Sequence, residues 1–161
     1  DKHTEYVIAA VAQWGQPCTL WLLRYGPEGP RIAALAERLG VGVQWFAPQP
    51  IPVVAALYRA VDIVVDRFDT GSFGLTTLMA LASGKPVITW INGPAHAWAG
   101  DVLPVPPVHN CRTVPEIVVA LQALQDAEVR TEGGARGRAW VEQWQTPARV
   151  TACWQEVFRA V

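Results

Sequence analysis

Residues 66–89 read DRFDTGSFGLTTLMALASGKPVIT and decide the fold of this 161-residue chain. The segment lies between two apolar runs that are typical of strands, and its centre has the period of a helix. The apolar positions recur at i, i+3, i+4 and i+7, namely at Leu75, Leu78, Met79 and Ala82. This spacing predicts a helix with one apolar face that follows a strand directly.

The two ends of this predicted helix carry residues typical of helix termini. Ser72 suits an N-cap because its hydroxyl can accept a hydrogen bond from a first-turn amide. Gly84 and Pro86 are typical of a helix end. Gly71 and Gly74 leave the loop and the first turn without bulky side chains. Free amides at the positive end of a helix suit a phosphate, although an ordinary turn would explain the glycines equally well.

The rest of the chain alternates predicted strands with predicted helices. We expect strands at 19–24, 43–46, 61–66 and 87–90, and helices at 4–14, 31–39, 53–60, 115–125, 131–144 and 147–158. A short strand is expected near 102–103, and Gly133 and Gly134 are expected to interrupt the helix at 131–144. The apolar run at 19–24 is typical of a strand covered on both faces. This order predicts a doubly wound, Rossmann-like parallel sheet in three layers, α/β/α, with ligands at the carboxyl ends of the strands.

The composition indicates one soluble, cytoplasmic domain. The 13 Lys and Arg residues nearly balance the 14 Asp and Glu residues, which argues against a nucleic-acid binder. No apolar run approaches the roughly 20 residues of a membrane span, and we expect no signal peptide. The three cysteines fit neither a zinc site nor a disulfide framework, so we expect reduced, partly buried thiols. Most of the eight tryptophans are expected to lie in or near the core.

The central segment resembles the donor-site segment of the retaining GT-B glycosyltransferases, particularly the family 4 group. There a strand ending in Asp leads to a Gly-Phe-Gly-Leu loop, a helix ending Glu-Ala-Met-Ala-x-Gly, and then Lys/Leu-Pro-Val-Ile. The corresponding segments here are 62–66 (DIVVD), 72–75 (SFGL), 79–84 (MALASG) and 85–88 (KPVI). The resemblance implies that the chain is one half of a GT-B fold, the half that binds a nucleotide-sugar donor.

The similarity extends over nearly the whole chain. Residues 20–30 resemble the family's strand followed by Gly-x-Gly-Pro-Glu, with Arg24 and Tyr25 at the first glycine and its neighbour. Residues 43–48 stand where the family contacts the nucleobase, chiefly through backbone groups. The resemblance therefore implies donor contacts at the end of this segment, at Phe46, Ala47 and Pro48.

The resemblance also implies a reaction, the transfer of a sugar from a nucleotide-diphosphate sugar with retention and without a metal or other cofactor. Lys2 lies in a segment similar to the family's Lys-Gly-Thr, whose lysine holds the donor diphosphate, although a solvated terminal lysine explains it equally well. The family's matching Arg and the first strand of the domain would precede residue 1. Backbone amides of the loop would bind the same diphosphate, at Ser72, Phe73, Gly74 and Leu75.

Two positions depart from the family pattern. Gly71 and Met79 replace glutamates that the family associates with the transferred sugar and with the ribose hydroxyls. Met79 cannot make the charge-assisted bonds of a carboxylate, and its simplest role is in the apolar helix face. Asp66 or Asp69 is the candidate catalytic carboxylate instead, with a loop cap or turn residue as the alternative for each.

Residues 1–161 form one predicted domain, and a GT-B active site lies between two. The resemblance therefore implies an acceptor-binding N-terminal domain or partner chain. It also implies a role in polysaccharide or glycoconjugate biosynthesis, and it is compatible with peripheral membrane association of the full enzyme. We expect the isolated domain to bind nucleotide weakly and to be inactive. The alternative is a non-catalytic GT-B-like module that binds a nucleotide or a protein. A sugar-nucleotide epimerase would need acid and base residues that the sequence does not identify, because the loop histidines His96 and His109 lack a paired carboxylate.

Overall fold

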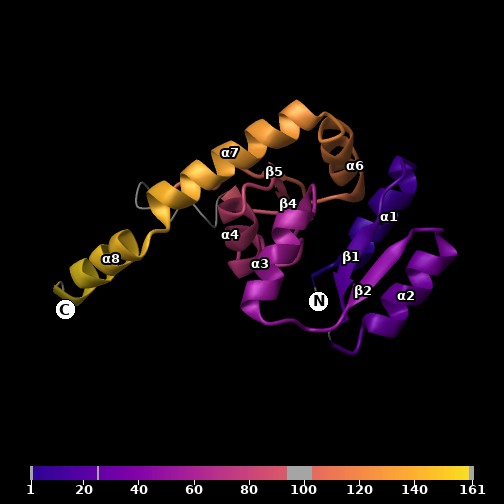
Figure 1. Ribbon diagram of the computed structural model, residues 1–161, viewed down its shortest axis with the longest axis horizontal. Coiled ribbons are helices and arrows are strands. Elements are labelled where there is room, and N and C mark those ends of the chain that lie inside the picture. The colour runs from indigo at the N-terminus through magenta and orange to yellow at the C-terminus, as the bar shows by residue number, and fades with distance from the viewer. Residues whose placement is uncertain (1, 25, 94–102, 160–161) are drawn as a thin grey trace.

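The strands form two parallel sheets in the computed structural model, which describes residues 2–24, 26–93 and 103–159 (Figure 1). In chain order they are β1 (Leu20–Leu23), β2 (Val43–Phe46), β3 (Val64–Val65), β4 (Val87–Thr89) and β5 (His109–Asn110). β1 pairs with β2 with Leu20 opposite Val43, and β4 lies between β3 and β5. The predicted parallel α/β class is confirmed, but the described strands do not join into one continuous sheet.

The predicted helices are all present, with shifts of a few residues at some of their ends. They are α1 (Thr4–Trp14), α2 (Gly29–Arg38), α3 (Ile51–Ala60), α4 (Leu75–Ala82), α6 (Val114–Ala123), α7 (Ala127–Trp144) and α8 (Pro147–Arg159). Successive strand residues point to opposite faces of a sheet. Val65 and Ile88 accordingly pack with α1 and α6, whereas Val64 and Val87 pack with α3, α4 and α7. Helices therefore cover both faces of the β3–β4–β5 sheet, as three layers require.

The β1–β2 sheet is covered on one face. Leu22 and Trp45 pack against α1 and α2, in the cluster built on Ile8 and Ile32. Trp21 lies on the other face and is 40% exposed, and Leu23 is 49% exposed. The prediction that this strand is covered on both faces is therefore wrong for the described structure.

Helices α4 and α7 pack closely because α7 carries glycines. A Cβ atom at Gly134 would overlap the carbonyl oxygen of Gly84, and one at Gly137 would come within 2.5 Å of the Leu81 side chain. The prediction that the Gly133–Gly134 pair interrupts this helix is wrong, since α7 is continuous. The glycines cost helix propensity but permit this approach.

The apolar face predicted for the central helix is wrong in part: of its four residues, Leu78 packs against a core cluster. The buried residues of α4 are Thr77, Ala80 and Leu81. Of the predicted face, Leu78 and Met79 are only half-buried, Ala82 is exposed, and Leu75 is 66% exposed. The helix begins at Leu75, so its first residue projects at the end of the loop rather than into the core.

The remaining predictions have mixed outcomes. The strand β5 lies in a proline-rich stretch and was not predicted, while Val102 and His96 lie outside the described residues. Of the seven described tryptophans, only Trp21 and Trp154 are exposed. The cysteines are free, one exposed, one half-buried and one buried. Among the helices of the described ranges, none is long and apolar enough to cross a membrane.

Candidate functional site

The candidate site lies where β3 ends and α4 begins. The first helical bond of α4 runs from the Leu78 amide to the Gly74 carbonyl, 3.1 Å, so the amides of Leu75, Thr76 and Thr77 precede the helical ladder. Gly74 occupies the N-cap position and supplies no side-chain cap. The chain thus presents an uncapped helix start at the carboxyl end of a parallel strand.

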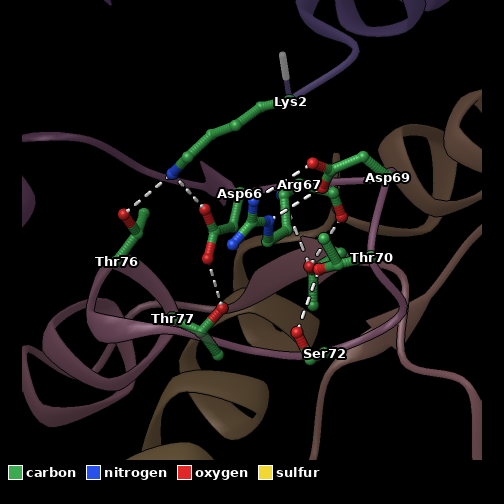
Figure 2. A network of polar contacts seen from close by, with 9 residues as sticks. Lys2, Asp66, Arg67, Asp69, Thr70, Ser72, Thr76 and Thr77 are labelled. Carbon is green, nitrogen blue, oxygen red and sulfur yellow. Dashed lines mark hydrogen bonds and ion pairs between the residues drawn. The ribbon is translucent and has the colours of Figure 1, made fainter.

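Ser72 does not cap α4, contrary to the sequence prediction. Its hydroxyl lies 2.9 Å from the hydroxyl of Thr70, within the loop that precedes the helix (Figure 2). The helix starts three residues after Ser72, beyond the reach that an N-cap side chain has. The hydroxyl therefore stabilises the loop and leaves the helix start open.

Asp66 joins three parts of the site. Its Oδ1 accepts a hydrogen bond from Lys2 Nζ at 2.7 Å, and its Oδ2 accepts one from the Thr77 hydroxyl at 2.8 Å (Figure 2). Lys2 also donates to the hydroxyl of Thr76 at 3.3 Å. The Asp66 side chain is 1% exposed and the Lys2 side chain 47% exposed. The lysine therefore reaches both a buried carboxylate and the first turn of α4 while remaining open to solvent.

Asp69 pairs with Arg67 two residues earlier. Arg67 Nε and one terminal nitrogen donate to the two carboxylate oxygens at 2.8 and 3.1 Å, a bidentate arrangement. These hydrogen bonds from Arg67 lower the pKa of Asp69 from 3.8 to about 2. Asp69 is therefore ionised and already paired, and the candidate carboxylates Asp66 and Asp69 have different surroundings.

Gly71 has a backbone conformation that a side chain would strain. Its φ is +66°, in the left-handed region, and a Cβ atom there would lie 2.7 Å from the Cβ of Asn92. The Gly71 carbonyl accepts a hydrogen bond from the Asn92 amide at 2.8 Å, which holds the two segments together. A glutamate cannot occupy this position without a change in the loop.

Phe73 packs inward rather than toward the helix start. Its ring meets Trp140 of α7 edge to face, with centroids 5.9 Å apart, in the cluster that also contains Leu81. The sequence prediction for Phe73 concerned its backbone amide and stays a prediction. The ring itself anchors the loop to the core.

The other predicted donor-binding residues lie at the ends of β1 and β2. The Arg24 guanidinium lies over the Trp45 ring, 5.7 Å from its centroid, and the ring of Phe46 packs against Trp21. Ala47 and Pro48 are exposed, and the Ala47 carbonyl accepts a hydrogen bond from Gln49. Tyr25 lies outside the described residues. These side chains form a second group, on the other sheet.

Sequence reasoning missed Arg67, Thr76 and Thr77. One signal was available for Thr77. The strand ends in Asp66, the helix that follows has a threonine at a buried position, and a buried hydroxyl needs a hydrogen-bond partner. His109 lies on β5, where burial and then the charge of Arg136 lower its pKa. Within residues 2–24, 26–93 and 103–159, no His, Cys, Asp or Glu side chains group as metal ligands. The expectation that no metal is needed stays a prediction.

Comparison with known proteins finds sequence similarity to glycosyltransferases. No family model matches the chain. The D-inositol 3-phosphate glycosyltransferase of Corynebacterium jeikeium is 36% identical over 95 residues, 58% of this chain and 22% of the relative. That of Geodermatophilus obscurus is 29% identical over 123 residues, 74% of this chain and 27% of the relative. The chain thus spans about a quarter of the length of these curated relatives.

Solved structures show the same fold at low sequence identity. Sucrose-phosphate synthase from Thermosynechococcus elongatus has a TM-score of 0.75 at 24% identity, over 99% of this chain and 43% of that one. The C-terminal domain of a glycosyl transferase group 1 family protein from Francisella tularensis has a TM-score of 0.69 at 21% identity, over 91% and 80%. The chain therefore has the α/β fold of GT-B glycosyltransferase domains, which confirms the fold predicted from the sequence.

The first prediction concerns the two loop glycines. We expect Gly71→Ser to lower the free energy of unfolding by about 1–3 kcal/mol, because it forces a side chain into a left-handed conformation beside Asn92. Gly74→Ser is the matched control, since a Cβ atom there meets open space and serine is a good N-cap. Urea unfolding of both variants measures the difference. Equal losses of unfolding free energy in the two variants would show that the backbone conformation of Gly71 does not exclude a side chain.

The second prediction concerns the acid dependence contributed by Asp69. Its folded pKa is lowered, so its stabilising contribution is present above pH 4 and is lost as the pH falls toward about 2. We expect the stability difference between the wild type and Asp69→Asn to be constant above pH 5 and to shrink below pH 4. Chemical unfolding at a series of pH values tests this. A difference that does not change between pH 5 and pH 3 would show that Arg67 does not lower this pKa.

Proposed function

We propose that the chain is the donor-binding part of a glycosyltransferase that transfers a sugar from a nucleotide-diphosphate sugar, with retention and without a metal. The observation that carries this proposal is the uncapped start of α4 beside the ammonium of Lys2, a side chain that is 47% exposed. Amides at a helix start and a nearby cation are the groups that bind a diphosphate. Similarity to glycosyltransferases along most of the chain supports the choice of reaction.

The chemistry requires that the departing diphosphate be stabilised. As the bond to the sugar breaks, negative charge develops on the leaving phosphate, and fixed dipoles and cations lower the energy of that state. Lys2 and the amides of residues 72–75 would supply them here. Asp69, Gly71 and Met79 would lie around the sugar and ribose, and Arg24, Tyr25, Phe46, Ala47 and Pro48 would lie around the nucleoside.

The conformation of Gly71 favours a second candidate function. A glycine fixed at φ +66° against Asn92 excludes the carboxylate that the family associates with the transferred sugar. A non-catalytic module that binds the nucleotide but does not transfer sugar would tolerate this loss. Sugar transfer or donor hydrolysis separates the two functions, because binding alone is common to both. It is measured on this chain joined to the acceptor-binding domain that the resemblance implies, which we call the intact polypeptide.

We also propose that one further strand, supplied by residues that precede Lys2 in the intact polypeptide, lies between β1 and β3. On β1, the amides of Leu20 and Arg24 donate to β2, so the backbone groups of Trp21 and Leu23 point to the opposite edge. On β3, the amides of Val64 and Asp66 donate to β4, so the backbone groups of Ile63 and Val65 point away from it. The described residues supply no strand for either of these edges.

The position of the first helix supports this arrangement. The Phe68 amide donates to the Lys2 carbonyl at 3.3 Å, so a segment that ends at Lys2 would run alongside β3 and parallel to it. Helix α1 packs on both sheets, with Ile8 against the β1–β2 side and Val7 against the β3–β4 side. A strand before α1 would thus be joined to β1 by the usual crossover. An acceptor-binding domain would precede that strand.

The third prediction concerns nucleotide binding by the intact polypeptide. We expect at least one of UDP, GDP and ADP to raise its melting temperature, and Lys2→Met to weaken binding about 10-fold or more through the loss of a charge-assisted contact. Lys85→Met is the matched control, because Lys85 is the other lysine of the chain and follows the C-terminal end of α4. Calorimetry measures the dissociation constants. A folded wild type that binds none of the three would reject the donor site.

The fourth prediction concerns the two open strand edges. We expect the amides of Trp21, Leu23, Ile63 and Val65 to exchange about 100-fold more slowly in the intact polypeptide than in the 161-residue chain. The amides of Val64 and Asp66 are internal controls, because they are already bonded to β4. Hydrogen exchange followed by NMR gives each rate. Equal rates at the four amides in both forms would exclude an inserted strand.

A further inference from the structure

We propose that Asp66 is a positioning residue that holds the Lys2 ammonium at the start of α4, rather than a residue that touches the donor. This inference rests on the proposed donor site, because it assigns a role within it. The Asp66 side chain is 1% exposed, and both of its oxygens already accept hydrogen bonds. A ligand arriving from solvent meets Lys2 and not the carboxylate behind it.

The ammonium keeps one donor for a ligand. A lysine Nζ carries three donors, and those of Lys2 meet Asp66 at 2.7 Å and Thr76 at 3.3 Å among the described residues (Figure 2). The third is left to face a phosphate oxygen. Because Thr76 belongs to the first turn of α4, these two contacts fix the ammonium beside the uncapped amides.

The carboxylate is itself held firmly. Thr77 lies on α4 next to Thr76 and is fully buried, and its hydroxyl donates to the second oxygen of Asp66. Asp66 therefore connects the end of β3 to α4 on one side and to Lys2 on the other. Without Asp66, the four-carbon side chain of Lys2 would lose its fixed position and bind a phosphate at a greater entropic cost.

A different role for Asp66 makes the opposite prediction. If Asp66 only neutralised Lys2, its removal would leave a full positive charge and would strengthen the binding of an anion. If Asp66 positions Lys2, its removal weakens binding, and it does so only while Lys2 is present. The sign of the effect and its dependence on Lys2 therefore separate the two roles.

A double-mutant cycle on the intact polypeptide tests the positioning role. The variants are Asp66→Asn, Lys2→Met and their combination, and calorimetry measures binding of UDP, GDP, ADP and inorganic pyrophosphate. We expect D66N to weaken the tightest of these about 10-fold in the wild-type background and less than about 2-fold in the K2M background. Melting temperatures without ligand confirm that each variant is folded, and K2M is expected to be the least stable because it leaves a buried carboxylate without its partner.

Asp69→Asn is the matched control for charge. It removes the same negative charge from the same loop, but Asp69 is paired with Arg67. We expect its effect on binding to be the same in the wild-type and K2M backgrounds. The positioning role is wrong if D66N strengthens binding, or if it weakens binding equally in both backgrounds. A folded wild type that binds none of the four probes rejects the donor site itself, which is a distinct result.

Discussion

The interaction on which the site depends is that of a buried carboxylate with a lysine ammonium. Asp66 is out of solvent, and a buried charge is tolerated only when it is paired and hydrogen-bonded. Lys2 and Thr77 meet that requirement from two directions. The segment before α1, the end of β3 and the first turn of α4 are therefore fixed relative to one another. A site built from these three parts keeps its shape because breaking it would leave the carboxylate unpaired.

Helix α4 is held in place from its other end as well. Gly134 and Gly137 allow α7 to approach the backbone of Gly84 and the side chain of Leu81. Phe73, just before the helix, adds an aromatic contact with Trp140 of the same helix α7. The loop between β3 and α4 is thus anchored at Asp66 and again at Phe73. The short segment between these two residues, which includes Gly71 and Ser72, determines the shape of the loop before the helix.

The fold could be predicted from the sequence because its helices and strands have local, periodic patterns of apolar residues. Strand β2 and helix α1 have the predicted bounds, since apolar spacing and glycine at the helix end mark them directly. The contacts of Lys2 could not be predicted, because they join it to residues more than 60 positions away. The apolar face of α4 was misassigned for a related reason. The buried face of α4 includes Thr77, whose hydroxyl donates to Asp66, so it differs from the face that the spacing of leucine and methionine predicts. Apolar periodicity alone does not detect a buried polar residue.

Gly71 and Met79, the two positions where the resemblance would place glutamates, differ in backbone conformation. The sequence alone could not show this difference. At position 79 the chain follows a regular helix and Met79 is half-buried, so the absence of a carboxylate is a matter of the side chain only. At position 71 the backbone itself has turned into the left-handed region and lies against Asn92. A carboxylate there would require a new loop path and the loss of the Asn92 hydrogen bond. The loop conformation therefore excludes a side chain at position 71, and a carboxylate that contacts a sugar would have to come from another position.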